Sequence, residues 1–170
     1  MDKTITTALL IIASVVAAVL VINAVFPAIS RSSSSIAQIS DRMNERIETQ
    51  ISIVYATGEL DASHVWQDTD SDGHFDVTVW VKNVGSARIL GVDQADIFFG
   101  ETGSTSRIPY VDDAGGGHPD WSYSLENGTE WDNTTTLKIS IHYASALTTD
   151  TYVVKVITPS GAYDELCFSF

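Results

Sequence analysis

The acidic segment 68–76 holds the residues of this sequence best suited to bind a metal ion. It reads DTDSDGHFD, with aspartates at its first, third and fifth positions and a glycine at its sixth. This spacing matches the first half of a calcium-binding loop, where carboxylate oxygens suit a hard cation and glycine allows a sharp turn. We therefore expect calcium as a cofactor, bound by four side chains and one histidine carbonyl: Asp68, Asp70, Asp72, His74 and Asp76.

The motif is incomplete, and it leaves an alternative open. The twelfth position, which holds a bidentate glutamate in a full EF-hand loop, is Val79 here. Four aspartates within nine residues repel one another, which favours a bound cation or high salt. The alternative is an acidic turn that only faces water.

Two tripeptides match the acceptor motif for N-glycosylation, which marks exposed loops of secreted proteins. They begin at Asn127 and Asn133, in a part of the chain rich in turn-forming residues. We expect a glycoprotein if this region lies outside the cell, although such tripeptides also arise by chance.

The sequence lacks the residue patterns of common enzymes. Its single cysteine, Cys167, has no histidine near it in the sequence and is expected to be a small buried residue. No nucleophile elbow and no glycine-rich phosphate loop is present. We therefore expect no enzymatic activity.

Charge is strongly acidic and unevenly distributed along the chain. Its 170 residues include 9 basic and 22 acidic ones, which gives a net charge of −13. Residues 1–50 carry four of each sign, so the whole excess lies in residues 51–170. Nucleic-acid binding needs a basic face, which excludes that class of partner. We expect two domains with these boundaries.

The first domain begins with an apolar run that indicates a membrane-spanning or packed helix. Residues 5–29 contain no charged residue, and about 20 apolar residues suffice to span a bilayer core. A cleaved secretory signal would be shorter and would end in a small-residue cleavage site, which is not evident here. Pro27 should kink the helix, and the serines at 32–35 should loosen it.

An amphipathic helix is predicted to continue to about residue 50. Apolar residues three or four positions apart form one stripe, namely Ile36, Ile39, Met43, Ile47, Ile51 and Val54. The alternatives are a simple membrane anchor with a stalk and a helix that packs against its own copies. For the second, the predicted assembly residues are Ile5, Leu9, Ile12, Val16, Val19, Ile22, Phe26, Ile36, Ile39, Met43 and Ile47.

The second domain is predicted to consist of β-strands. Residues 75–82 alternate between apolar and polar side chains and end at the turn signal Asn83-Val84-Gly85. Further strands are expected at 51–57, where the strand competes with the end of the helix, and at 89–92, 95–99, 105–110, 121–125, 134–143, 152–158 and 166–170. The expected fold class is α+β, with a long N-terminal apolar α-helix followed by an all-β immunoglobulin-like sandwich.

This arrangement resembles the archaellin (archaeal flagellin) and type IV pilin-like superfamily, including the archaellum accessory proteins F and G. The resemblance rests on the short lead Met1-Asp2-Lys3, the apolar helix, and segment 68–85, where DTDSDG precedes VTVWVKNVGS. It implies a helical filament, or a complex associated with one, with apolar helices inside and β domains outside that are sometimes glycosylated or metal-bound.

The sequence departs from the family pattern at two places. Family members cleaved by the class III signal peptidase carry a basic leader, whereas only Asp2 and Lys3 precede the apolar run, so the chain is either already mature or never cleaved. Position 5 is Ile5 rather than the glutamate of bacterial type IV pilins, which favours an archaellum-type protein.

Two functions therefore remain open. The first, which we expect, is a subunit of an extracellular filament for motility or adhesion at the cell surface. Its identical subunits would be inserted in the membrane before they assemble. The alternative is a membrane-anchored accessory or stator protein whose β domain binds another archaellum component or a surface layer.

Overall fold

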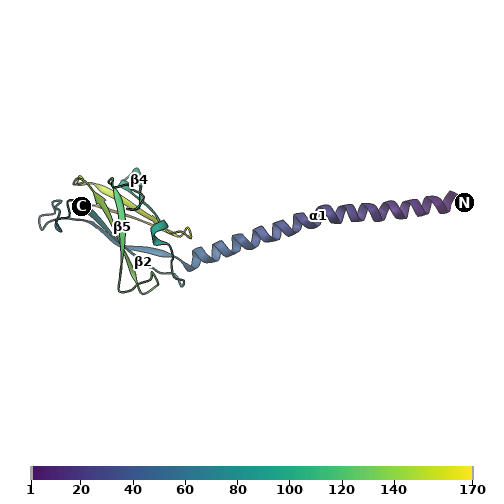
Figure 1. The fold of residues 1–170 in the computed structure, drawn as a ribbon, viewed down its shortest axis with the longest axis horizontal. Coiled ribbons are helices and arrows are strands. Elements are labelled where there is room, and N and C mark those ends of the chain that lie inside the picture. The colour runs from purple at the N-terminus through teal and green to yellow at the C-terminus, as the bar shows by residue number, and fades with distance from the viewer. Residues whose placement is uncertain (1, 170) are drawn as a thin grey trace. The chain divides into compact units, whose positions relative to one another are not determined.

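The computed structural model describes residues 2–169, which form a long helix, a short 3₁₀-helix and eight strands (Figure 1). The chain divides into two compact units after Met43. We call the second unit, which contains all eight strands, the β domain. The boundary lies earlier than the expected residue 50 because the end of the helix is hydrogen-bonded to the β domain. The carbonyl of Glu48 accepts from the backbone amide of Ala87 at 2.9 Å.

Helix α1 (Asp2–Glu48) runs without interruption through Pro27 and the serine run. The expected loosening at the serines is wrong. The hydroxyls of Ser34 and Ser35 donate to the carbonyl of Arg31 at 3.0 and 2.9 Å, so their polar groups are satisfied within the helix. None of the described residues of α1 is buried.

The strand predicted at 51–57 is confirmed as β1 (Ile51–Gly58), so the last two residues of the predicted apolar stripe, Ile51 and Val54, are not helical. Their spacing continues the apolar stripe of the helix, but backbone pairing decides their conformation. Ile51 lies opposite Asn83 in the ladder between β1 and β2. A bulge between Ile53 and Tyr55 then shifts the register, and Val54 is left exposed there.

The eight strands form two four-stranded antiparallel sheets. The first sheet has the order β1-β2-β6-β5, and its further strands are β2 (Phe75–Asn83), β6 (Thr136–Tyr143) and β5 (Asp120–Glu126). The second has the order β4-β3-β7-β8, with β4 (Ser104–Ile108), β3 (Asp96–Glu101), β7 (Thr151–Ile157) and β8 (Tyr163–Ser169). The predicted α+β fold, a long helix followed by a β-sandwich, is confirmed.

One predicted strand is wrong, and one extends beyond the described residues. At 89–92 only Ile89 pairs, through an isolated bridge to Trp131, and η1 (Val92–Gln94) follows as a 3₁₀-helix. The left-handed conformation of Gly91 turns the chain between them. Residue 170 of the predicted last strand lies outside the described residues.

The core lies between the sheets, and strand alternation decides which side chains enter it. On β2 and β6 the fully buried residues are Val77, Val79, Val81, Leu137, Ile139 and Ile141. Because successive side chains point to opposite faces, Asp76 and His142 lie on the outer face of the first sheet. This face positions the candidate site.

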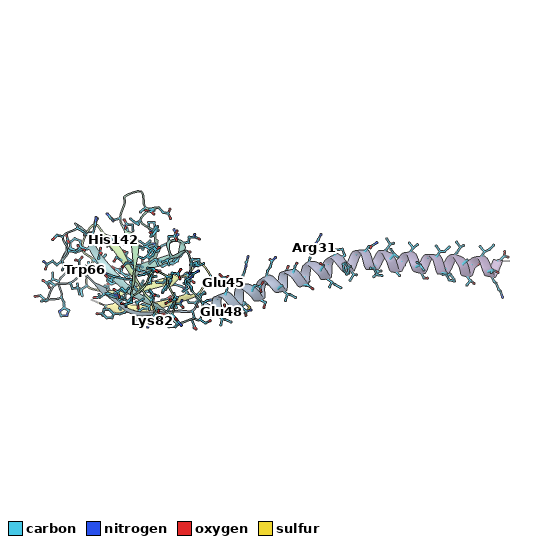
Figure 2. All side chains as sticks on the ribbon, turned by 60° about the horizontal axis from the view of Figure 1, so that its bottom comes forward. Arg31, Glu45, Glu48, Trp66, Lys82 and His142 are labelled. Atoms are coloured by element: carbon cyan, nitrogen blue, oxygen red, sulfur yellow. The ribbon has the colours of Figure 1, made fainter. Side chains whose placement is uncertain are left out.

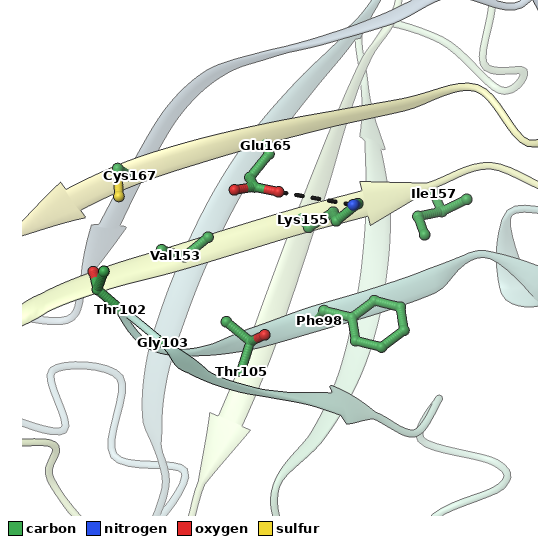
Figure 3. Close-up of a pocket in the computed structure, with 9 residues that line it drawn as sticks. All are labelled: Phe98, Thr102, Gly103, Thr105, Val153, Lys155, Ile157, Glu165 and Cys167. Atoms are coloured by element: carbon green, nitrogen blue, oxygen red, sulfur yellow. Dashed lines mark ion pairs between the residues drawn. The ribbon is translucent and has the colours of Figure 1, made fainter.

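The outer face of the second sheet is hollowed into a shallow cavity of about 470 Å³ (Figure 3). Phe98, Val153 and Ile157 contribute its apolar surface, and the Lys155 ammonium lies 3.8 Å from a Glu165 carboxylate oxygen within it. Cys167 also lines the cavity and is exposed, contrary to expectation, because the outward-facing positions of an outer strand carry it.

Candidate functional site

The predicted metal loop folds around its own carboxylates. Asp68 accepts hydrogen bonds from the backbone amides of Ser71 and Gly73 at 2.6 and 2.9 Å. Asp72 accepts from the amide of His74 at 2.8 Å. Gly73 has a φ of 90°, so the glycine makes the sharp turn that the motif predicted.

The predicted ligands do not form one group. The four aspartates divide between two groups, and His74, whose backbone carbonyl was the predicted ligand, belongs to neither. In the first, ligand atoms of Glu59, Asp68 and Asp70 lie within 4.8 Å of one another. In the second, the same holds for Asp72, Asp76 and His142. The loop turns between Asp70 and Asp72, which directs consecutive aspartates of the motif to different partners.

Glu59 was not predicted, and it ties the loop to the end of β1. One of its carboxylate oxygens accepts from the amide and the hydroxyl of Thr69, both at 2.5 Å. The other accepts from the amide of Asp76 at 3.2 Å. Glu59 follows β1 directly, so only the pairing of β1 with β2 brings it to this loop.

The second group arises from strand register. Asp76 on β2 lies opposite His142 on β6, which lies opposite Asp120 on β5. The His142 Nδ1 is 2.7 Å from a carboxylate oxygen of Asp76, and its Nε2 is 2.9 Å from the hydroxyl of Ser122. The imidazole is therefore fixed at both nitrogens.

Two further histidines complete what we call the histidine–aspartate cluster: His74, Asp76, His118, Asp120 and His142. The His118 Nδ1 lies 3.0 Å from the Asp120 carboxylate. The rings of His74 and His118 are 4.2 Å apart between centroids, and those of His74 and His142 are 6.2 Å apart. Three of the protein's four histidines thus meet at one end of the first sheet.

Two polar atoms of this cluster are buried without a hydrogen-bond partner among the described residues. Asp120 is only 3% exposed, and its Oδ1 has no partner, while its Oδ2 faces His118. The Nδ1 of His74 is likewise buried and unpaired. A buried polar atom without a partner costs about 1–3 kcal/mol, so the cluster has unused capacity to bind a ligand.

The charges around the two groups favour a cation. The hydrogen bond to Asp76 raises the pKa of His142, burial opposes this shift, and the carboxylates of Asp76, Asp120 and Asp72 add to it. At Asp70 the hydrogen bond from the Asp72 amide lowers the pKa. Burial and the carboxylates of Asp72, Glu59 and Asp76 outweigh it and raise the pKa overall.

Sequence reasoning identified four of the aspartates but missed Glu59, His118, Asp120 and His142. His142 occupies an outward position of a strand that was predicted correctly, so its side could have been inferred from alternation. Its partner could not, because the pairing of β2, β6 and β5 joins segments more than forty residues apart in places, such as Asp76 and His142.

The two glycosylation motifs differ in their surroundings. Asn127 lies in an exposed turn with φ 65°, and Thr129 of its motif is exposed too. Asn133 is exposed, but Thr135 of its motif is only 1% exposed and donates its hydroxyl to Asp132 at 3.1 Å.

All predicted assembly residues are exposed along α1. Among the described residues, this is the one helix whose length and apolar composition allow it to cross a membrane. Its apolar surface has no partner within the described chain, so a bilayer or another protein is needed to cover it.

Comparison with known proteins decides the family. A family model for archaeal-type flagellin matches residues 2–168, and thus both the helix and the β domain. The chain belongs to the archaeal-type flagellin family. It is also 30% identical to an uncharacterized protein of Archaeoglobus fulgidus, over 99% of this chain and 98% of that one.

Solved structures of archaellum proteins share the fold of this family member. One is the archaellum periplasmic stator protein FlaG from Sulfolobus acidocaldarius, with 23% identity, a TM-score of 0.54 and coverage of 71% of this chain and 99% of that chain. Another is the stator complex of FlaF and FlaG from the same organism, with 23% identity, a TM-score of 0.53 and coverage of 71% and 89%. The predicted relation to archaellins and their accessory proteins is confirmed.

Proposed function

We propose that this protein is a membrane-anchored accessory protein of the archaellum. Its α1 helix holds it in the membrane, and its β domain lies outside the membrane and binds another archaellum component or a cell-surface layer. This is the alternative raised by the sequence, and the comparisons favour it over the filament subunit that we expected.

The observation that carries the proposal is the structural match to the stator protein FlaG, which covers 71% of this chain and 99% of that chain. The apolar run of α1 has the length of a single membrane span. The chain has a net charge of −13, and most of its acidic residues lie in the β domain. Such a charge keeps a domain soluble, which fits a β domain in water outside the membrane.

The filament subunit is kept as the second candidate because the flagellin family model covers the helix as well as the β domain. In that case the exposed apolar side chains of α1 would pack against neighbouring subunits instead of lipid. Burial of such surface contributes about 25 cal/mol per Å² in water, and packing alone drives association within the bilayer.

Cys167 allows a direct search for the partner of the β domain, because it is the only cysteine and is exposed on the second sheet. A photo-crosslinker attached to it in native membranes is expected to capture a different archaellum or surface-layer protein. The control is Cys167→Ser combined with Ser124→Cys, which moves the probe to an exposed position on β5 of the first sheet.

Crosslinks mainly between identical chains within filaments would contradict the accessory role and support the filament subunit. Capture of the same partner from both probe positions would show nonspecific labelling of nearby proteins. That outcome would contradict binding of the partner through the second sheet, which carries Cys167.

A further inference from the structure

We propose that the end of the first sheet binds a divalent transition-metal ion of the zinc type, with Asp72, Asp76 and the Nδ1 of His142 as ligands. Ligand atoms of these three residues lie within 4.8 Å of one another. Asp72 and Asp76 belong to the loop for which the sequence suggested calcium, but the imidazole nitrogen of His142 gives this site a donor that the oxygen-only calcium loop lacks. The proposal does not depend on the role proposed for the protein.

The donor atoms select the class of metal. Calcium and magnesium are bound by oxygen ligands, whereas imidazole together with carboxylates suits zinc, copper, nickel and iron. The calcium-type donors of this region, Glu59, Asp68 and Asp70, form the other group. The imidazole therefore separates the two sites chemically.

The geometry needs only a small adjustment. Nδ1 of His142 and the nearest Asp76 oxygen are 2.7 Å apart. Zinc bonds of about 2.0–2.2 Å in a tetrahedral arrangement place two ligand atoms about 3.3 Å apart. Rotation of exposed Asp72 and partly buried Asp76 provides this room. The proton shared between Nδ1 and Asp76 leaves to solvent as the metal enters.

Ser122 already provides the outer support that metal-binding histidines need. Its hydroxyl lies 2.9 Å from Nε2 of His142. A hydrogen bond at the nitrogen that does not bind the metal fixes the tautomer and the ring orientation. With Nε2–H donating to Ser122, Nδ1 is the nitrogen available for the metal.

The unpaired buried atoms supply an independent sign of a missing ligand. Asp120 is 3% exposed and lies beside His142 in the ladder, yet its Oδ1 has no partner among the described residues. The unpaired Nδ1 of His74 belongs to a ring that lies tilted against the His118 ring, 4.2 Å away between centroids, and His118 faces the same aspartate. A bound cation would offset the charge of this buried carboxylate.

The place of the site indicates what the metal does. Figure 2 shows His142 and Trp66 at one end of the β domain and Glu45 and Glu48 at the other. At the His142 end, the metal would join the loop that carries Asp72 to the ends of β2 and β6. It would therefore stabilise the end of the β domain that carries His142 and Trp66.

The test is zinc binding by the full chain in detergent after removal of metals with a chelator. We expect one zinc per chain by calorimetry, a tetrahedral absorption spectrum when cobalt replaces zinc, and a rise in melting temperature. His142→Gln should weaken binding at least tenfold. Ser122→Ala leaves all three ligands in place but removes the hydrogen bond that orients His142. It should weaken zinc affinity about 10–100-fold, the usual effect of losing such a partner.

The matched control is the fourth histidine, which lies outside the cluster. His64 is exposed and has φ 60°, a conformation that asparagine tolerates, so His64→Asn should leave zinc binding unchanged. The proposal is overturned if zinc does not bind, if His142→Gln and Ser122→Ala both bind as tightly as the wild type, or if excess calcium displaces the zinc.

Discussion

Asp132 shows at the residue scale how one carboxylate organises a turn. Its Oδ1 accepts hydrogen bonds from the amides and the hydroxyls of both Thr134 and Thr135, at 2.7 to 3.1 Å. The hydrogen bonds from Thr134 and Thr135 lower the pKa of Asp132, against a smaller opposing effect of burial. The ionised form therefore stabilises the turn.

The lowered pKa of Asp132 predicts that the stability of the protein depends on pH in the acidic range. Because the folded pKa lies below the ordinary value of 3.8, the contribution of Asp132 is present above pH 3.8 and is lost as pH falls through the folded pKa. Asp132→Asn should melt at a lower temperature than the wild type at pH 7, and the difference should shrink near pH 3. An equal difference at both pH values would contradict the role of the charge.

The same turn contains the second glycosylation motif and makes its surroundings differ from those of the first. Asn127 and Thr129 are both exposed, whereas Thr135 is held by Asp132 and packs against Gly128, where an added Cβ would lie 2.5 Å from the Thr135 hydroxyl. We expect higher glycan occupancy at Asn127 than at Asn133. Glycopeptide mass spectrometry of the native protein measures both, with Asn127→Gln as the control. Greater occupancy at Asn133 would contradict this order.

The calcium predicted from the sequence is best tested at Asp70. Within residues 2–169, this exposed side chain accepts only one hydrogen bond, from the Asp72 amide at 3.2 Å. The hydrogen bond from the Asp72 amide lowers the pKa of Asp70, but desolvation and repulsion by nearby carboxylates outweigh it and raise the pKa overall. Removing this charge by Asp70→Asn should therefore not lower the melting temperature without calcium. Millimolar calcium should raise the melting temperature of the wild type but not that of Asp70→Asn. Asp113→Asn, outside the loop, serves as control. A wild type that melts identically with and without calcium would remove the prediction.

At the scale of elements, the loop after β2 holds the end of α1. The amides of Val84 and Gly85 donate to the carbonyl of Gln50 at 2.8 and 2.9 Å. A Cβ on Gly85 would lie 1.9 Å from the carbonyl oxygen of Glu48, so no side chain fits there. The turn signal Asn83-Val84-Gly85 therefore also joins the helix to the β domain.

Gly85→Ala should accordingly destabilise the β domain by about 1–3 kcal/mol, the range of overpacking in a tight contact. Urea unfolding of the full chain in detergent, followed by tryptophan fluorescence, measures this. Gly117→Ala, where the nearest atom would lie 3.5 Å away, should change the free energy of unfolding by less than about 0.5 kcal/mol. Equal stability of both variants would mean that the loop and helix end do not pack this closely.

Sequence patterns predicted the elements better than their ends and contacts. The period of two identified β2 and β6, whose inner faces are fully buried. At the end of the helix, Ile51 and Val54 fit both a helical stripe and the strand predicted at 51–57, and only pairing with β2 decides between the two. The candidate site was missed in part for the same reason, since Glu59 and His142 reach it through strand register.

At the scale of the whole molecule, the chain combines an exposed apolar helix with a polar β-sandwich of the archaeal-type flagellin family. Its apolar run cannot remain exposed in water, so it must lie in a bilayer or among other helices. The accessory role and the filament role differ in which of these two covers it.

Location in the cell therefore tests the central claim most directly. Filaments sheared from native cells and the membranes of the same cells are compared by quantitative mass spectrometry. An accessory protein is expected in the membrane fraction, while a different chain makes up the filament. The account is contradicted if this chain is the main repeating subunit of the sheared filaments and is depleted from the membranes.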